Sequence, residues 1–298
     1  MNGGIILLDK PSGMTSFDCD KTVRRVTGIK KVGHSGTLDP FATGLLPVFA
    51  GDALKFMRYT DDYDKAYYCR ALFGKTSDTG DKDGVITDVS RPGREDTDKI
   101  KSALYEVASR KEQIPPKYSA KKINGVKAYD LARQGVEFTL KPNRIEIYSL
   151  DISDMTVCDD GVAVSFTVHC SKGTYIRTIC TDAGELSGFG AYALELRRLK
   201  CGPFDVENAI TPAELEDALR SWRNIFADPV VTLDSMPVTV LSDKHADDIR
   251  CGRKIPAKAL DGFDHKDGVL CKAVSSSGAL IAVIYQDNGI IRIDRGFA

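Results

Sequence analysis

The sequence contains no long hydrophobic run. None of the apolar stretches in its 298 residues approaches the about 20 residues that a membrane-spanning helix needs. The N-terminus also lacks the basic start and long apolar core that are typical of a secretory signal peptide. We therefore expect a cytoplasmic protein that does not bind membranes.

Metal-ligand patterns are also missing. The eight cysteines form no Cys-x-x-Cys pair, and none of the four histidines stands at zinc-ligand spacing from them. In a reducing compartment, cysteines scattered in this way are expected to be free and buried. The sequence therefore predicts neither a metal site nor a set of disulfides.

The chain has no overall excess of charge, because 41 Lys and Arg oppose 42 Asp and Glu. The distribution is uneven, with net charges of +3 over residues 1–60, +5 over 100–147 and −7 over 148–240. Two basic stretches in an otherwise acidic chain suit one face that binds a polyanion. A solvated surface of mixed charge explains imbalances of this size equally well.

A loop at residues 33–47, GHSGTLDPFATGLLP, is the most distinctive stretch that is present. Its three glycines and two prolines predict a shaped loop rather than regular structure. His34 and Asp39 are its candidates for chemistry. Pro40 biases Asp39 away from the α region, so the carboxylate is presented from an extended or turn backbone. An Asp-Pro pair is also typical of a helix N-cap followed by a first-turn proline, and this alternative stays open.

The hydrophobic pattern predicts an α+β protein. Alternating or continuous apolar segments predict strands at 5–8, 45–50, 65–73, 144–150, 162–168 and 193–199. Helical spacing and capping residues predict helices at 15–28, 51–59, 95–112, 126–134, 174–186 and 211–221. From about residue 236 the chain consists of short β segments and turns, which indicates a small second domain.

Arg177 stands out by its place in this pattern. It follows the strand at 162–168 and falls in the first turn of a helix that Thr174 is predicted to cap. A cation at a helix N-terminus opposes the helix dipole, which costs a few tenths of a kcal/mol unless an anion compensates. Arg177 is therefore expected to bind a carboxylate or a phosphate, the alternative being an ordinary ion pair with Asp182 or Glu185.

Lys10 and Tyr67 each allow two interpretations. Lys10 follows the first strand and precedes a Pro-Ser-Gly turn, where it is either a phosphate contact or an ordinary surface lysine. Tyr67 lies on the strand at 65–73, where a lone tyrosine is most often a half-buried packing residue. Spacing alone does not choose between these alternatives.

Motifs along most of the chain resemble those of the TruB family, the bacterial tRNA pseudouridine-55 synthases. They are LDKPSGMTS at 8–16, the loop at 33–47, KAY at 65–67, QIPPKYSA at 113–120, AYDLARQG at 128–135, CSKGTYIR at 170–177 and LRRL at 196–199. Each motif is weak alone, but their order and spacing make the resemblance specific. The last sixty or so residues resemble the family's small PUA-like RNA-binding domain more loosely.

The resemblance implies a two-domain architecture. Residues 1–230 would form the catalytic domain, with a mixed or antiparallel central sheet flanked by helices. A segment around 95–140 would be inserted in it to contact RNA. Residues 236–298 would form a β-rich, PUA-like RNA-binding domain. A monomer is expected.

The activity that the resemblance implies is the isomerisation of uridine 55 in the TΨC loop of tRNA. The target base is flipped out of its stack, its glycosidic bond is cleaved, and it is reattached through C5. Such an isomerisation requires neither a cofactor nor a metal. The expected partner is the TΨC stem-loop of tRNA, and assistance in tRNA folding is a further expected activity.

Asp39 is the residue that the resemblance assigns to the chemistry. Its carboxylate would attack ribose C1′, attack C6 of the base, or abstract a proton on a route through a glycal, and the sequence leaves these three routes open. A carboxylate inside a water-excluding site must be compensated by a cation. Arg177 is the expected cation, since its guanidinium would hold Asp39 charged and oriented.

The remaining site residues follow from the resemblance in the same way. Tyr67 would stack on the flipped base and help with proton transfer at C5, and Tyr175 would line the same pocket. Leu196 would hold the uracil edge through its main chain. His34 would fill the gap that the flipped uridine leaves, and Lys10 would contact the substrate.

Two other functions remain open on the sequence. The basic stretches and the small second domain also suit an RNA-binding or tRNA-folding module for which catalysis is dispensable. A glycosidase that excises the base shares the carboxylate chemistry. It would release free uracil, whereas an isomerase yields a C-linked nucleoside.

Overall fold

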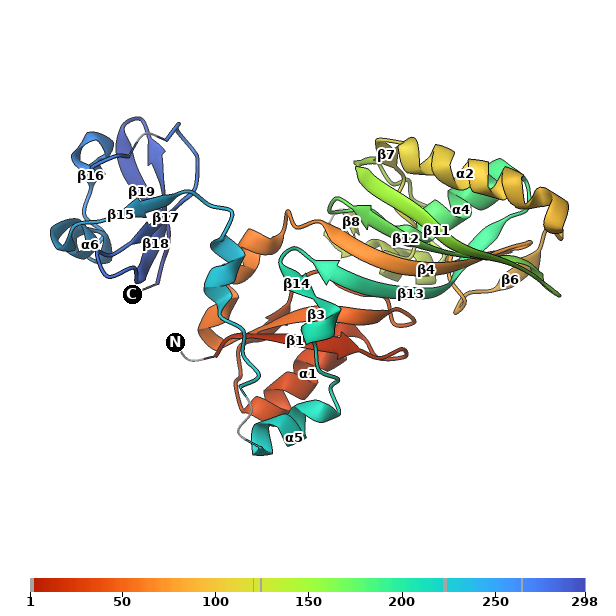
Figure 1. Ribbon diagram of the computed structural model, residues 1–298, viewed down its shortest axis with the longest axis horizontal. Helices are drawn as coiled ribbons and strands as arrows, with labels where there is room; N and C mark the ends of the chain where they lie inside the picture. Colours follow the sequence, from red (N-terminus) through yellow and green to blue (C-terminus); the bar gives the residue numbers. More distant parts are fainter. Residues whose placement is uncertain (1–2, 120, 124, 222–223, 264, 298) are drawn as a thin grey trace. The chain divides into compact units, whose positions relative to one another are not determined.

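The computed structural model in Figure 1 describes residues 3–119, 121–123, 125–221, 224–263 and 265–297. Ala120, the last residue of the motif at 113–120, lies outside the described residues. The chain divides into two compact units, Met1–Ala227 and Asp228–Ala298. Each unit has a hydrophobic core of its own, so each is described by itself.

The first unit is built on one mixed sheet. Its strands are β1 (Ile5–Lys10), β2 (Val32–His34), β3 (Thr43–Ala50), β4 (Lys65–Phe73), β11 (Ile147–Cys158), β12 (Gly161–Cys170), β13 (Ala191–Cys201) and β14 (Phe204–Asp205). The main path runs β1-β3-β13-β4-β12-β11, with β2 paired to β3 and β14 to β13. β13 runs parallel to β3, and the other neighbours pair antiparallel. The expected α+β fold with a mixed central sheet is confirmed.

Helices cover this sheet in two places. The α-helices are α1 (Ser16–Thr27), α2 (Thr97–Ser109), α3 (Ala128–Arg133), α4 (Ile176–Ser187) and α5 (Glu214–Arg220), and the 3-10 helices are η1 (Gly51–Thr60), η2 (Arg94–Asp96) and η3 (Val206–Asn208). Figure 1 shows α2 and α4 on the same side of the β4-β12-β11 part, where their apolar faces join the core. α1 and α5 pack near β1 and β3.

The unit also contains three short two-stranded sheets. β5 (Lys75–Ser77) pairs with β6 (Ile86–Asp88) and β8 (Lys122–Ile123) with β9 (Val126–Lys127) as hairpins, and β7 (Glu112–Gln113) pairs with the more distant β10 (Asn143–Arg144). All eight cysteines are free thiols, and six of them are buried. The prediction of free cysteines that are mostly buried is therefore confirmed.

Local signals determine the bounds of α1. Thr15 is the N-cap and forms a reciprocal capping box with Asp18. At the other end, Gly28 adopts a left-handed conformation with φ +71°, which a residue with a side chain rarely adopts. The helix predicted from Thr15 to Gly28 is therefore confirmed at both ends.

Other element bounds differ from the prediction. The N-cap of α4 (Ile176–Ser187) is Tyr175, one residue later than expected. The hydroxyl of Thr174, the expected N-cap, donates to the carbonyl of Ser171 at 3.0 Å instead of capping the helix. The segment 51–59 is helical as expected, but it forms the 3-10 helix η1.

The second unit has a five-stranded sheet. Its strands are β15 (Val238–Val240), β16 (Ile255–Pro256), β17 (Cys271–Val274), β18 (Leu280–Asp287) and β19 (Ile290–Gly296), in the order β15-β17-β18-β19-β16. The helix α6 (Asp243–Arg250) and the 3-10 helices η4 (Pro229–Leu233) and η5 (Ala257–Ala259) complete it. The unit is β-rich, as the composition of this part of the chain predicts.

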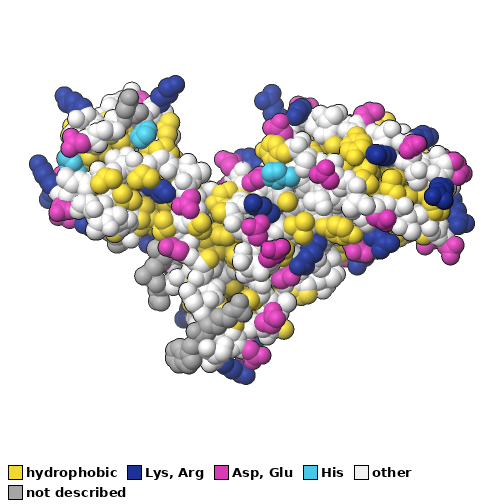
Figure 2. Space-filling model, in the orientation of Figure 1, with side chains coloured by type: hydrophobic (Ala, Val, Ile, Leu, Met, Phe, Trp, Pro, Cys, Tyr) yellow, Lys and Arg dark blue, Asp and Glu magenta, His cyan; other side chains and the backbone are white. Residues whose placement is uncertain are grey.

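The surface carries both signs of charge. On the face drawn in Figure 2, basic and acidic side chains are interspersed rather than gathered into one block. That face is not the single basic face that the charge distribution suggested. Within the ranges that the structure describes, no helix is both long and apolar enough to cross a membrane.

Candidate active site

The loop between β2 and β3 is irregular, as its glycines and prolines predict. The Asp39 carbonyl accepts the Ala42 N–H at 3.1 Å in a turn, and no helix follows. The helix N-cap interpretation of Asp39 is therefore wrong. Ser16 at the start of α1 holds the loop through two hydrogen bonds. Its hydroxyl accepts the Leu38 N–H at 2.9 Å and donates to the Leu38 carbonyl at 3.1 Å.

Lys10 supports the same loop from the end of β1. Its side chain is fully buried, and its Nζ donates to the carbonyls of Pro11, Met14 and Pro40 at 3.0, 2.7 and 3.1 Å. Burial lowers the pKa of Lys10 to about 8. The prediction that Lys10 contacts the substrate is corrected, because an ammonium with its three donors used on carbonyls has none left for a phosphate.

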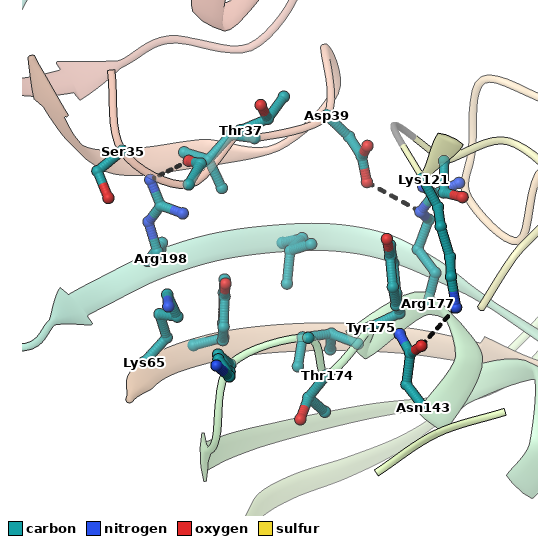
Figure 3. A pocket seen from close by; sticks show the side chains of 18 of the residues that line it. Ser35, Thr37, Asp39, Lys65, Lys121, Asn143, Thr174, Tyr175, Arg177 and Arg198 are labelled. Atoms are coloured by element: carbon teal, nitrogen blue, oxygen red, sulfur yellow. Dashed lines mark hydrogen bonds and ion pairs between the residues drawn. The ribbon is translucent and has the colours of Figure 1, made fainter. Parts of the chain in front are cut away.

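Asp39 meets Arg177 across the site. Arg177 Nε lies 2.9 Å from Asp39 Oδ2, and the dashed line in Figure 3 marks this pair. The Arg177 side chain is 3% exposed and the Asp39 side chain 35%. The expected ion pair is present, although the two residues are far apart in sequence. Asp182, the alternative partner of Arg177, pairs instead with Arg110 at 3.2 Å.

A second carboxylate that the sequence did not single out shares Arg177. Asp81 Oδ2 lies 3.2 Å from Arg177 Nη1, and the Asp81 side chain is 8% exposed. The remaining guanidinium donors reach the carbonyls of Thr79 at 2.7 Å and Tyr118 at 2.8 Å. Asp81 lies in the β5–β6 hairpin, whose Gly- and Asp-rich sequence looks like an ordinary acidic turn. Only the fold reveals its role.

The electrostatics of this cluster favour a basic Asp39. Burial raises the pKa of the Asp39 carboxyl above its usual value, the Arg177 guanidinium opposes that rise, and the charge of Asp81 adds to it. Two carboxylates therefore share one guanidinium. The Asp39 anion is a stronger base and nucleophile than a solvated aspartate.

A cavity of about 850 Å³ opens beside this cluster. Five of the seven predicted site residues line it, namely Asp39, Tyr67, Tyr175, Arg177 and Leu196. Its lining also includes the basic side chains Lys65, Lys121, Arg144, Lys172 and Arg198. The volume lies within the about 300–1,000 Å³ that is usual for small-molecule sites, and the basic lining suits an anionic ligand.

Tyr67 faces the cavity from β4. Burial raises its pKa to about 12, and a hydrogen bond with Arg198 opposes that rise. Arg198, buried on β13, also donates to the carbonyls of Leu45 at 2.7 Å and Gly36 at 2.9 Å. Arg198 therefore connects the loop that carries Asp39 to β13 and to the hydroxyl of Tyr67. The sequence showed it only as part of the LRRL motif.

Tyr175 and Leu196 complete the walls. The backbone of Tyr175 is held by the amide of Gln113, which accepts its N–H at 2.8 Å and donates to its carbonyl at 3.1 Å. Burial raises the pKa of the Tyr175 hydroxyl. Leu196 is a buried strand residue on β13 whose carbonyl accepts the Thr43 hydroxyl at 3.4 Å.

His34 stands at the end of β2, immediately before the cavity-lining residues Ser35 and Gly36, and is not itself part of the lining. Its Nδ1 lies 3.0 Å from Asp20 Oδ2 and its Nε2 lies 3.3 Å from Thr37 Oγ1. Five of the predicted site residues therefore line one cavity, and His34 lies next to its lining in the sequence. Lys10 is instead buried, with its ammonium bound to backbone carbonyls that include that of Pro40 in the loop.

The arrangement can perform carboxylate chemistry on a ligand of nucleoside size. It offers a basic carboxylate oriented by a guanidinium, a neutral phenol and an apolar wall around one cavity. A carboxylate in this setting can act as a nucleophile or as a base next to a glycosidic carbon. Among the described residues, no three His, Cys, Asp or Glu side chains form a group that could hold a metal ion.

Two models of known protein families match most of this chain. The model for "TruB family pseudouridylate synthase (N terminal domain)" matches residues 24–176, and that for "tRNA pseudouridylate synthase B C-terminal domain" matches residues 177–236. The first match contains Asp39 and Tyr67, and the second begins at Arg177.

Individual relatives point the same way. A protein of Syntrophotalea carbinolica named tRNA pseudouridine synthase B is 39% identical over 293 residues, covering 95% of this chain and 92% of that one. The protein of the same name from Escherichia coli O1:K1 is 42% identical over 214 residues, covering 72% and 67%. Among solved structures, one titled as a Cbf5-Nop10-Gar1 complex matches with a TM-score of 0.74 at 23% identity, covering 99% of this chain and 85% of that one.

Proposed function

Because this chain belongs to the TruB family and is an isomerase that makes pseudouridine in tRNA, we propose that its target is uridine 55 in the TΨC loop. The ion pair of Asp39 and Arg177 inside a nucleoside-sized cavity is the observation that carries the proposed chemistry, and the family supports the choice of this uridine. The cavity is large enough for a base with its ribose, so we propose that the uridine leaves its stack to reach Asp39.

In the proposed reaction, the flipped uracil enters the cavity and Asp39 acts at the ribose or the base. Attack at C1′, attack at C6 and elimination to a glycal all use the same carboxylate, and all three remain open. The N1–C1′ bond breaks, the base turns within the cavity, and a bond forms from C5 to C1′. The C5 proton then passes to solvent while N1 takes up a proton from it, so the product is an isomer of the substrate. The overall reaction is an isomerisation and adds no group to the substrate, so no cofactor or metal is proposed.

We assign the neighbouring residues to holding the base. The pKa of Tyr67 near 12 leaves its phenol protonated at neutral pH, which favours a stacking role over that of a base. Tyr175 and Leu196 form the wall of the same cavity. His34, beside the opening, would occupy the space that the uridine vacates, since a flat ring can stack there.

The tRNA itself would bind around the cavity. Lys121, Arg144 and Lys172 are basic residues of its lining, and Lys121 and Arg144 belong to the part of the chain with a net charge of +5. We propose that the segment around 95–140 and the β-rich second unit, residues 236–298, contact further parts of the tRNA. We also propose that the protein acts as a monomer and assists tRNA folding.

The test uses unmodified tRNA labelled with tritium at C5 of its uridines. Isomerisation replaces the C5–H bond, so one equivalent of tritium should appear in water, and mapping should place pseudouridine at position 55. A tRNA with cytidine at position 55 is the matched control and should release none. Failure of the wild-type protein to release tritium, or release from another position, would contradict the proposed target.

The same experiment separates the two other functions. A base-excising glycosidase would release free uracil, which chromatography detects. A dispensable catalytic site predicts that Asp39→Asn still binds tRNA and assists its folding. Binding without any tritium release by the wild-type protein would favour that second function.

A further inference from the structure

Asp20 is a buried carboxylate that the proposed mechanism does not use. It lies in the second turn of α1, outside every motif that carried the family resemblance, and its side chain is 5% exposed. Its Oδ2 lies 3.0 Å from His34 Nδ1. Its Oδ1 is buried and has no hydrogen-bond partner within the part of the chain that the structure describes.

A structural role alone does not account for this side chain. An aspartate inside a helix has low helix propensity, and a buried carboxylate oxygen without a partner is destabilising. Arg24, one turn further along α1, comes only within 4.0 Å of Asp20 Oδ2, and its Nη2 donates instead to the carbonyl of Val32 at 2.7 Å. The close partner of the carboxylate is therefore the His34 ring.

The contact determines how the ring is held. A carboxylate only accepts, so Nδ1 of His34 carries the hydrogen that it donates to Asp20. With Nδ1 used in this way, Nε2 lies toward the Thr37 hydroxyl at 3.3 Å. The His34 ring is therefore contacted by Asp20 of α1 at Nδ1 and by Thr37 of its own loop at Nε2. The side chain remains 17% exposed and directly precedes the cavity-lining residues Ser35 and Gly36 in the sequence.

We propose that Asp20 is a positioning residue for His34. By accepting the Nδ1–H it holds the imidazole in one orientation before tRNA binds, so that the ring is ready to fill the space left by the flipped uridine. This inference rests on the proposed function. A ring that is ordered in advance loses less freedom on binding, which improves formation of the flipped complex by about tenfold.

The test compares Asp20→Leu, which removes the acceptor, with Asp20→Asn, whose amide oxygen still accepts the Nδ1–H. Filter binding gives the Kd for tRNA, and single-turnover tritium release gives the rate. We expect Asp20→Leu to lower the ratio of rate to Kd by about tenfold, and Asp20→Asn to stay within about twofold of the wild type. In a His34→Ala background, Asp20→Leu should have no further effect.

Two controls keep the result interpretable. Arg25→Leu changes an exposed charged side chain of the same helix without touching His34 or the capping box, so its effect on the melting temperature measures the effect on α1 alone. The ¹⁵N shifts of the His34 ring report the nitrogen that carries the hydrogen, which should be Nδ1 in the wild type and in Asp20→Asn but not in Asp20→Leu.

Two results would overturn the inference: an Asp20→Leu protein with wild-type kinetics, or a loss that persists in the His34→Ala background. Absence of pseudouridine from the wild-type reaction would instead overturn the proposed function. In that case the ring-nitrogen shifts still decide whether Asp20 sets the state of His34, because they need no substrate.

Discussion

At the scale of single residues, the site depends on one guanidinium shared by two carboxylates. Arg177 is buried and contacts Asp39 at 2.9 Å and Asp81 at 3.2 Å. Its other donors are occupied by carbonyls of two separate loops. A lysine could not make these contacts together, since it lacks the planar fork of five donors. The residue therefore both orients Asp39 and organises the loops around it.

We expect Asp39→Asn to abolish pseudouridine formation without lowering the melting temperature. A carboxyl whose pKa is raised in the folded protein contributes stability below its ordinary pKa and loses that contribution as pH rises through the raised value. At neutral pH the ionised group is therefore not a net stabiliser. The melting temperature should stay within about 2 °C of the wild type or rise.

Scanning calorimetry at pH 7 and tritium release measure the two effects. Asp151→Asn, a change of an exposed carboxylate on β11, is the matched control and should leave both unchanged. A fall of several degrees in Asp39→Asn would show instead that the ion pair with Arg177 outweighs the cost of burying the carboxylate.

We expect Asp81→Asn to slow the reaction at neutral pH and to move the acid limb of the rate profile to lower pH. The charge of Asp81 helps to raise the pKa of Asp39, so neutralising it lets Asp39 ionise at lower pH. The Asp39 anion also becomes less basic, and Arg177 loses one of its partners. Single-turnover rates between pH 4 and about 8 measure the limb. An unchanged limb would contradict the coupling.

At the scale of elements, the loop between β2 and β3 is held by contacts from several sides. Ser16 at the start of α1 binds Leu38, Lys10 at the end of β1 binds the Pro40 carbonyl, and Arg198 on β13 binds the Gly36 carbonyl. The loop also buries Leu38, Phe41 and Ala42 in the hydrophobic core, so these hydrogen bonds and apolar packing together determine its shape. The position of Asp39 thus depends on three elements at once.

We expect Lys10→Met to reduce the rate and leave tRNA affinity almost unchanged. Methionine has a similar length but leaves three buried carbonyls without their donor, so the turn before Asp39 shifts. A lost phosphate contact would instead weaken binding and reduce its salt dependence. Filter binding at several salt concentrations, beside the single-turnover rate, separates the two. A weaker Kd with a normal rate would restore the phosphate interpretation.

At the scale of the whole molecule, the chain has two units with separate cores, and we propose catalysis for the first and RNA binding for the second. The cavity and all the candidate site residues lie within Met1–Ala227. The unit Asp228–Ala298 has its own apolar core, which includes Leu241, Ile249 and Ile284. An independent core makes each unit a candidate for independent folding.

We expect a chain truncated after Ala227 to melt cooperatively and to form pseudouridine at saturating tRNA, with a raised Kd. The missing unit would supply RNA contacts but none of the cavity lining. Calorimetry, filter binding and tritium release measure the three properties. Unchanged affinity would contradict an RNA-binding role for the second unit, and loss of the cooperative transition would show that the units fold together.

The sequence by itself determined the features whose causes are local. The start of α1 follows from Thr15 and its end from Gly28, because capping groups act within one turn. The strand Lys65–Phe73 follows from its alternation, and the irregular backbone around Asp39 from its glycines and prolines. The ordered motifs also pointed to the family to which the chain belongs.

Only the tertiary structure decided which distant groups meet. Arg177 binds the carbonyl of Thr79, 98 residues earlier, and with it Asp81, because a hairpin and a helix end converge. Lys10 looks like a surface lysine until the turn folds around its ammonium, and Asp20 like an ordinary helical aspartate until β2 brings His34 against it. Local propensity acts over a few residues, whereas burial and charge pairing depend on which elements the fold packs together.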